Sequence, residues 1–199
     1  MQNARLEARY AADCEHLLGR VREQSWRRFW VPAEVVCEAI GAAGFAITFE
    51  EMNEEDDDLA YCDVEDRRVV LRKDFGLRLR CPWVAHQVRN FTLAHELGHI
   101  RLHARLLRAG EWEPHWEEEA TFYARVFLIP RRLLMNRLET RSLLRGRVAS
   151  QSDLWGYVLS LAEAFCVSGK FMVHTLDAYG LIEFDPVTRW IRVCPSQVA

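Results

Sequence analysis

The chain of 199 residues lacks the features that mark membrane, secreted and disulfide-stabilised proteins. No apolar run approaches the roughly 20 residues that a membrane-spanning helix requires. The polar N-terminus leads into further charge instead of the apolar stretch of a signal peptide. The six cysteines form no C-x-x-C pair and no regular spacing, which is typical of free thiols in a reducing compartment. We therefore expect a soluble cytoplasmic protein with no membrane partner.

The chain also has few lysines and no net positive charge. Only Lys73 and Lys170 are lysines among 26 basic residues, and the formal net charge is −3. This charge does not favour direct nucleic-acid binding. Charge is nevertheless uneven along the chain, with seven acidic side chains in residues 50–58 and an arginine cluster that follows later: Arg131, Arg132, Arg137, Arg141, Arg145 and Arg147. Both stretches are interpreted as solvated surface, and docking of a basic partner to the acidic run stays open as an alternative.

The spacing of apolar residues predicts an α+β fold that is mainly helical and has a small three-stranded sheet. The expected helices cover 1–30, 33–43, 82–109 and 114–129, and the expected strands cover 45–49, 59–62 and 67–72. The tail predicts two helices with a short turn between them and then a hairpin, at 154–165, 169–179, 181–184 and 190–193. This order is that of a winged helix-turn-helix. We expect an N-terminal helix over 1–30, a main domain over 31–147 and a helix-turn-helix-like subdomain over 148–199 packed on it.

One segment carries recognisable chemistry, Phe-Thr-Leu-Ala-His-Glu-Leu-Gly-His-Ile-Arg-Leu-His at residues 91–103. His95 and His99 are four residues apart, so on a helix they stand about 40° apart around the axis and can bind one ion. Glu96 lies beside them, within reach of a metal-bound water but pointing away from the ion. This H-E-x-x-H arrangement is typical of zinc sites with a glutamate general base. The alternative is a pair of core histidines with hydrogen-bonded partners.

A catalytic zinc needs a third protein ligand, and the helix expected after residue 114 offers three consecutive glutamates. With Ala120 set at zero, Glu117 falls at about 60°, on the apolar face of that helix, while Glu118 points away and Glu119 lies on the flank. We therefore predict Glu117 as the ligand and keep Glu119 as the second choice. The small Ala120 and Ala124 would let this helix approach the zinc helix closely.

The implied reaction is metal-assisted hydrolysis of an amide. Zinc would acidify a bound water and polarise the carbonyl, and Glu96 would carry the proton to the leaving amine. One zinc per chain is expected, although two histidines and a carboxylate also accept Mn²⁺ or Fe²⁺. The sequence leaves several candidates for stabilising the oxyanion or orienting a ligand: His103, His115, Glu119, Tyr61 and Tyr123. His103 continues the zinc face by one turn, so we expect it to orient a ligand or to fill the core.

The chain resembles the ImmA/IrrE family of metallopeptidases. Four segments carry the resemblance: 91–103, 117–130, 161–168 and 176–182. The resemblance implies a zincin-like metallopeptidase domain over 31–147 and a zinc-dependent peptidase that cleaves a Cro/CI-type helix-turn-helix repressor. Such cleavage switches on mobile-element, stress or DNA-damage genes. His95, Glu96 and His99 match the family motif, and Glu117 matches the first glutamate of its E-x-E-A pattern. The chain departs from the pattern in having threonine at 121, where the family usually has Asn or Asp, and tyrosine at 123, where it usually has Phe.

A non-proteolytic regulatory protein that binds a transcription factor or DNA is the alternative function. The acidic run, the arginine cluster and the winged-helix-like tail favour it. The presumed recognition helix, however, has only Lys170 and His174 as basic residues, too few for strong phosphate contacts. Glu96 separates the two hypotheses, because a purely structural zinc does not require a general base beside its ligands.

Overall fold

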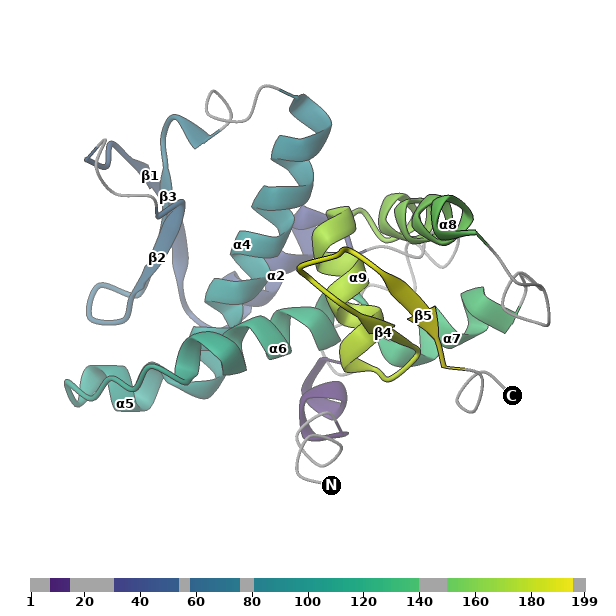
Figure 1. Ribbon diagram of the computed structural model, residues 1–199. Coiled ribbons are helices and arrows are strands. Elements are labelled where there is room, and N and C mark those ends of the chain that lie inside the picture. The colour runs from purple at the N-terminus through teal and green to yellow at the C-terminus, as the bar shows by residue number, and fades with distance from the viewer. Residues whose placement is uncertain (1–7, 15–30, 54–57, 76–80, 140–149, 195–199) are drawn as a thin grey trace. The chain divides into compact units, whose positions relative to one another are not determined.

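The computed structural model in Figure 1 describes residues 8–14, 31–53, 58–75, 81–139 and 150–194. The chain forms two compact units, Met1–Leu128 and Ile129–Ala199. The architecture is α+β and mostly helical with a small three-stranded sheet, which confirms the predicted fold class. Of the helix predicted over 1–30, residues 8–14 are helical and the rest lies outside the described residues. Residues 54–57 of the acidic run also lie outside them, as do Arg141, Arg145 and Arg147 of the arginine cluster.

The sheet of the first unit consists of β1 (Ala46–Glu50), β2 (Ala60–Asp63) and β3 (Arg68–Arg72). β3 is the central strand, since it pairs in parallel with β1 and antiparallel with β2, and its Val69, Val70 and Leu71 are buried. A tight turn joins β2 to β3, in which the Asp63 carboxylate accepts hydrogen bonds from two backbone N–H groups. β2 is therefore an edge strand, with no strand on its outer side in the described part of the chain.

The long helix α4 (Pro82–Leu102) is the centre of the first unit. It packs against α2 (Ala33–Ala42), α6 (Trp116–Leu128) and β2. Its apolar face is fully buried at Leu93, Ala94 and Leu97, which form part of the core. Because α4 also carries the H-E-x-x-H residues, the core of the unit holds these side chains in place.

The single helix predicted over 82–109 is interrupted at His103. α4 ends at Leu102, and a short helix α5 (Ala104–Arg108) begins after a break. His103 lies between the two helices with φ −118° and ψ −13°, and its N–H still donates to the His99 carbonyl at 2.8 Å. Its ring is only 1% exposed. The break between the two helices therefore falls at a buried side chain.

The second unit contains α7 (Arg131–Glu139), α8 (Gln151–Ala164), α9 (Gly169–Ala178) and the antiparallel strands β4 (Ile182–Phe184) and β5 (Ile191–Val193). α8 and α9 meet at 102°, within the range of a helix-turn-helix. The Gln151 side chain bonds both the N–H and the carbonyl of Ile191, which ties α8 to the hairpin. α8 begins three residues before the predicted start, because Ser150 and Asp153 form a capping box.

None of the described helices is long and apolar enough to cross a bilayer by itself. α8 and α9 reach the required length and composition only as a pair, and the break between them bends their axes by 102°.

Candidate metal centre

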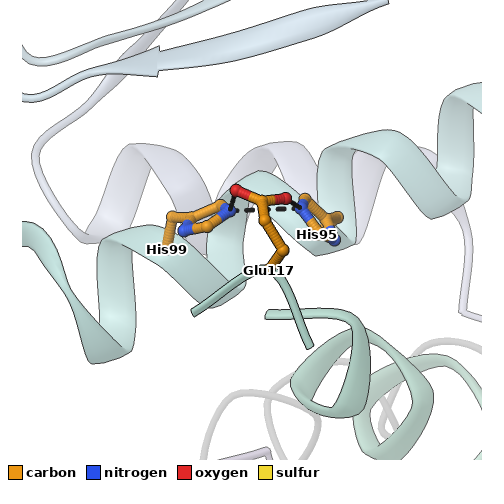
Figure 2. A group of neighbouring side chains, drawn as sticks. All are labelled: His95, His99 and Glu117. Carbon is orange, nitrogen blue, oxygen red and sulfur yellow. Dashed lines mark hydrogen bonds and ion pairs between the residues drawn. The ribbon is translucent and has the colours of Figure 1, made fainter. Parts of the chain in front are cut away.

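Three side chains from two helices converge in the first unit, as Figure 2 shows. α4 provides His95 and His99, and α6 provides Glu117. Their ligand atoms all lie within 4.8 Å of one another. Nε2 of His95 is 3.1 Å from Glu117 Oε2, Nε2 of His99 is 3.4 Å from Glu117 Oε1, and the two Nε2 atoms are 3.1 Å apart. Two imidazole nitrogens and a carboxylate form a donor set that suits Zn²⁺ and leaves one coordination position open.

The protonation of the site also suits a cation. Burial lowers the pKa of His95, and burial together with the neighbouring His95 lowers the pKa of His99 to about 4. Both imidazoles are thus held neutral, the form that binds a metal. Burial raises the pKa of Glu96 to about 8, and the charges of Glu117 and Asp58 add to the rise. A bound cation acts in the opposite direction and favours the ionised carboxylate of Glu96.

Each histidine of the pair is held by a further side chain at its other ring nitrogen. Thr121 Oγ1 is 3.2 Å from His95 Nδ1, and His103 Nδ1 is 3.2 Å from His99 Nδ1. With Nε2 free to bind a metal, each Nδ1 carries the proton and donates to its partner. His103 then carries its own proton on Nε2 and donates it to Glu119 Oε2 at 3.0 Å. A hydrogen-bonded chain therefore connects His99 through His103 to the Glu119 carboxylate.

The ring of His103 is fixed by packing as well as by hydrogen bonds. It lies flat on the Trp116 indole, with 4.8 Å between the ring centroids and 6° between the planes. Since Trp116 is 4% exposed, it shields this part of the network from water. His103 and Glu119 thus lie behind the metal-ligand group.

The two helices that carry the site touch through their backbones. A Cβ atom added at Gly98 would lie 2.9 Å from the Cα of Ala120 and 3.0 Å from its carbonyl oxygen. Ala120 and Ala124 are fully buried along the same face of α6. The glycine within His-Glu-Leu-Gly-His therefore permits α6 to approach closely enough for Glu117 to reach the histidines.

Gly98→Ala is expected to destabilise the protein by about 1–3 kcal/mol, because the new methyl group overlaps backbone atoms that cannot rotate away. The separation of α4 and α6 should also weaken zinc binding. Urea denaturation and zinc titration measure the two effects. Gly41→Ala in α2 is the matched control, because a Cβ there meets nothing within 4 Å and should be neutral or stabilising. Equal behaviour of the two variants would show that close helix contact is not required.

A cleft of about 510 Å³ opens beside the metal-ligand group. One wall is the edge strand β2 with Asp58 and Leu59 before it, and the other consists of α4, α5, α6 and the segment between α5 and α6. Glu96 is only 6% exposed yet lines this cleft. The lining residues are Asp58, Leu59, Ala60, Tyr61, Cys62, Phe91, Thr92, His95, Glu96, His99, Leu107, Trp112, Glu117 and Thr121. The edge strand β2 therefore borders the cleft directly.

The remaining candidates from the sequence lie in different places. Tyr61 lines the cleft. His115 lines a second cavity, of about 570 Å³, together with Tyr10 and Phe122. Tyr123 is fully buried, and its hydroxyl donates to Asp13 at 2.7 Å, within helical residues 8–14. The hydroxyl of this tyrosine thus binds the N-terminal segment and does not point into the cleft.

Sequence reasoning missed the roles of two residues. Thr121 was noted only as a departure from the usual family residue, yet it lies one helical turn after Glu117 and contacts His95. That i, i+4 spacing on one helix face is the signal that could have found it. Asp58 was treated as one member of a solvated acidic run, whereas its position immediately before the predicted second strand indicates a place at the edge of the sheet.

Comparison with known proteins agrees with this geometry. A peptidase family model described as the IrrE N-terminal-like domain matches residues 41–177. No curated protein matches the chain. The matched range includes β1–β3, α4 and α6, and therefore every residue of the metal-ligand group and of the cleft.

Proposed function

Since the chain belongs to the IrrE N-terminal-like family of metallopeptidases, we propose that it is a zinc-dependent endopeptidase. His95, His99 and Glu117 hold the metal, and Glu96 is the general base. The observation that carries the proposal is the convergence of two imidazole nitrogens and a carboxylate within 4.8 Å, beside a buried glutamate that lines the same cleft. Membership of a peptidase family implies a protein substrate.

The chain's own residues perform the proton transfers. When bound, zinc supplies Lewis-acid polarisation of the scissile carbonyl and raises the acidity of water. Glu96 accepts the proton of the attacking water on a carboxylate oxygen and then delivers it to the nitrogen of the leaving amine. Thr121 and His103 keep His95 and His99 in the tautomer that presents Nε2 to the metal.

We propose a helix-turn-helix repressor of the Cro/CI type as the substrate, cleaved in the cytoplasm during a stress, DNA-damage or mobile-element response. The resemblance of the two site motifs to the ImmA/IrrE family supports this choice. The test incubates the zinc-loaded protein with a small Cro/CI-type helix-turn-helix repressor, sought first among the neighbouring genes, with and without a chelator. The expected result is two repressor fragments that the chelator prevents, with an unrelated DNA-binding protein of similar size left intact. An intact repressor, or cleavage that the chelator does not stop, would count against the proposal.

The hydrogen-bonded chain behind His99 gives a prediction for zinc affinity. Glu119→Ala removes the acceptor of the His103 proton and should weaken zinc binding by about 10–100-fold, as loss of an outer partner of a ligand usually does. Glu119→Gln keeps an acceptor oxygen and should weaken binding less. Glu118→Ala is the control, because Glu118 is the preceding residue of the same helix and its side chain is exposed. Competition with a chromophoric chelator measures all three, and equal affinities of the two alanine variants would contradict the prediction.

A further inference from the structure

All charged side chains that line the cleft, apart from the neutral imidazoles, are acidic: Asp58, Glu96 and Glu117. No lysine or arginine is among the lining residues. A divalent ion at the metal-ligand group balances two negative charges, those of Glu96 and Glu117. The Asp58 charge then remains, at the end of the cleft where β2 begins.

The Asp58 carboxylate differs from the other described acids of the 50–58 run. Glu50 bonds Arg68 at 2.7 Å, and Glu51 pairs with Lys73 at 3.3 Å. Asp58 is contacted through its backbone carbonyl, which accepts a hydrogen bond from Arg72 Nε at 3.1 Å. Its exposed carboxylate has no ion pair with any described residue. This negative charge is therefore available to a ligand in the cleft.

Two exposed aromatic rings line the same cleft from different elements. Tyr61 on β2 is 44% exposed, and Trp112, between α5 and α6, is 60% exposed. Aromatic faces attract the guanidinium or ammonium group of a basic side chain, and the apolar stem of such a side chain packs on them. Asp58 and Tyr61, which lie on the same side of the cleft, thus offer a carboxylate for the charged group and a ring for the apolar stem of one arginine or lysine.

We propose that the cleft selects a cationic peptide segment, with an arginine or lysine side chain near the scissile bond bound by Asp58 and Tyr61. The inference rests on the proposed function, because it assigns part of the substrate of the same site. Asp58 and Tyr61 lie at the edge strand that borders the cleft, so an extended segment along β2 would bring a side chain to them. An acidic segment would be repelled by the same carboxylate.

A binding experiment tests this selection without requiring turnover. The probe is a set of three fluorescein-labelled decapeptides, identical except for a central Arg-Arg, Gln-Gln or Glu-Glu pair. Each is titrated by fluorescence anisotropy into zinc-loaded Glu96→Gln protein. The Arg-Arg peptide should bind about tenfold tighter than the Gln-Gln peptide, as expected for one exposed ion pair with cation–π contacts, and Glu-Glu should bind weakest. Added salt should reduce these differences.

Variants in the same Glu96→Gln background identify the residue that confers the preference. Asp58→Asn should bring the affinity ratio of the Arg-Arg and Gln-Gln peptides close to one. Glu65→Gln makes the same charge change at an exposed site outside the cleft and should keep the ratio. Tyr61→Leu keeps an apolar side chain without the ring and should lower the ratio partly. Circular dichroism compares the folding of all variants.

Three outcomes would overturn the inference: equal affinities for the three peptides, a ratio that Asp58→Asn does not change, or no binding of the Arg-Arg peptide. None of these outcomes bears on chelator-sensitive cleavage of a repressor, so each is compatible with the proposed function. Conversely, cleavage that is insensitive to a chelator would reject the proposed function without altering the peptide ratios.

Discussion

Glu96→Gln is expected to abolish cleavage while leaving zinc bound. Glutamine has nearly the same shape as glutamate but cannot accept the proton of the attacking water, and a general base contributes about 10²–10⁴-fold to such a reaction. Glu96 is not in the group of side chains whose ligand atoms converge, so zinc stoichiometry should be unchanged. A single amide substitution should therefore separate metal binding from catalysis.

Two measurements on one sample check this result, the initial rate of repressor cleavage and the zinc content after dialysis. Glu118→Gln is the matched control. It likewise replaces a carboxylate by an amide, at an exposed position of α6, so the variant should retain the full rate. If Glu96→Gln cleaves as fast as the unaltered protein, Glu96 is not the general base. If it loses zinc, its role is to bind the metal.

Glu117→Ala is expected to have the second large effect, on metal binding itself. It removes one of three protein ligands, so zinc affinity should fall by more than the roughly 100-fold that loss of an outer partner can cost. His95→Ala should behave similarly. Isothermal titration calorimetry of the metal-free variants with zinc measures both affinities.

The comparison with Glu119→Ala decides which glutamate is the ligand. Glu119 bonds His103 at 3.0 Å and does not belong to the converging group, so its variant should lose less zinc affinity than Glu117→Ala, about 10–100-fold. Full zinc occupancy in Glu117→Ala, with loss of zinc in Glu119→Ala, would reverse the assignment.

Local sequence patterns predicted much of the site because its residues follow helical spacing. The i, i+4 separation of His95 and His99 specifies their shared face, and the helix angle of Glu117 relative to Ala120 favours it over its neighbours. The structure brings these three side chains together. The small residues of α6 were expected to permit a close approach, and the position of Ala120 against Gly98 supplies the contact.

Other features depend on contacts between distant residues and could not be derived from spacing. The helix breaks at His103, whose buried ring stacks on Trp116, 13 positions later in the chain. The hydroxyl of Tyr123 has its partner at Asp13, separated from it by 110 positions. A one-dimensional pattern shows neither a stacking partner nor a distant hydrogen bond, so the turn after α4 and the role of Tyr123 required the structure.

The central claim is that one zinc ion held by His95, His99 and Glu117 makes the chain a peptidase. Stepwise addition of zinc to the chelator-stripped protein, with repressor cleavage followed at each step, tests it most directly. The account predicts no cleavage without metal, a rate that rises in proportion to zinc and a plateau at one equivalent per chain. Cleavage at the full rate by the stripped protein, or no cleavage at any zinc concentration, would contradict it.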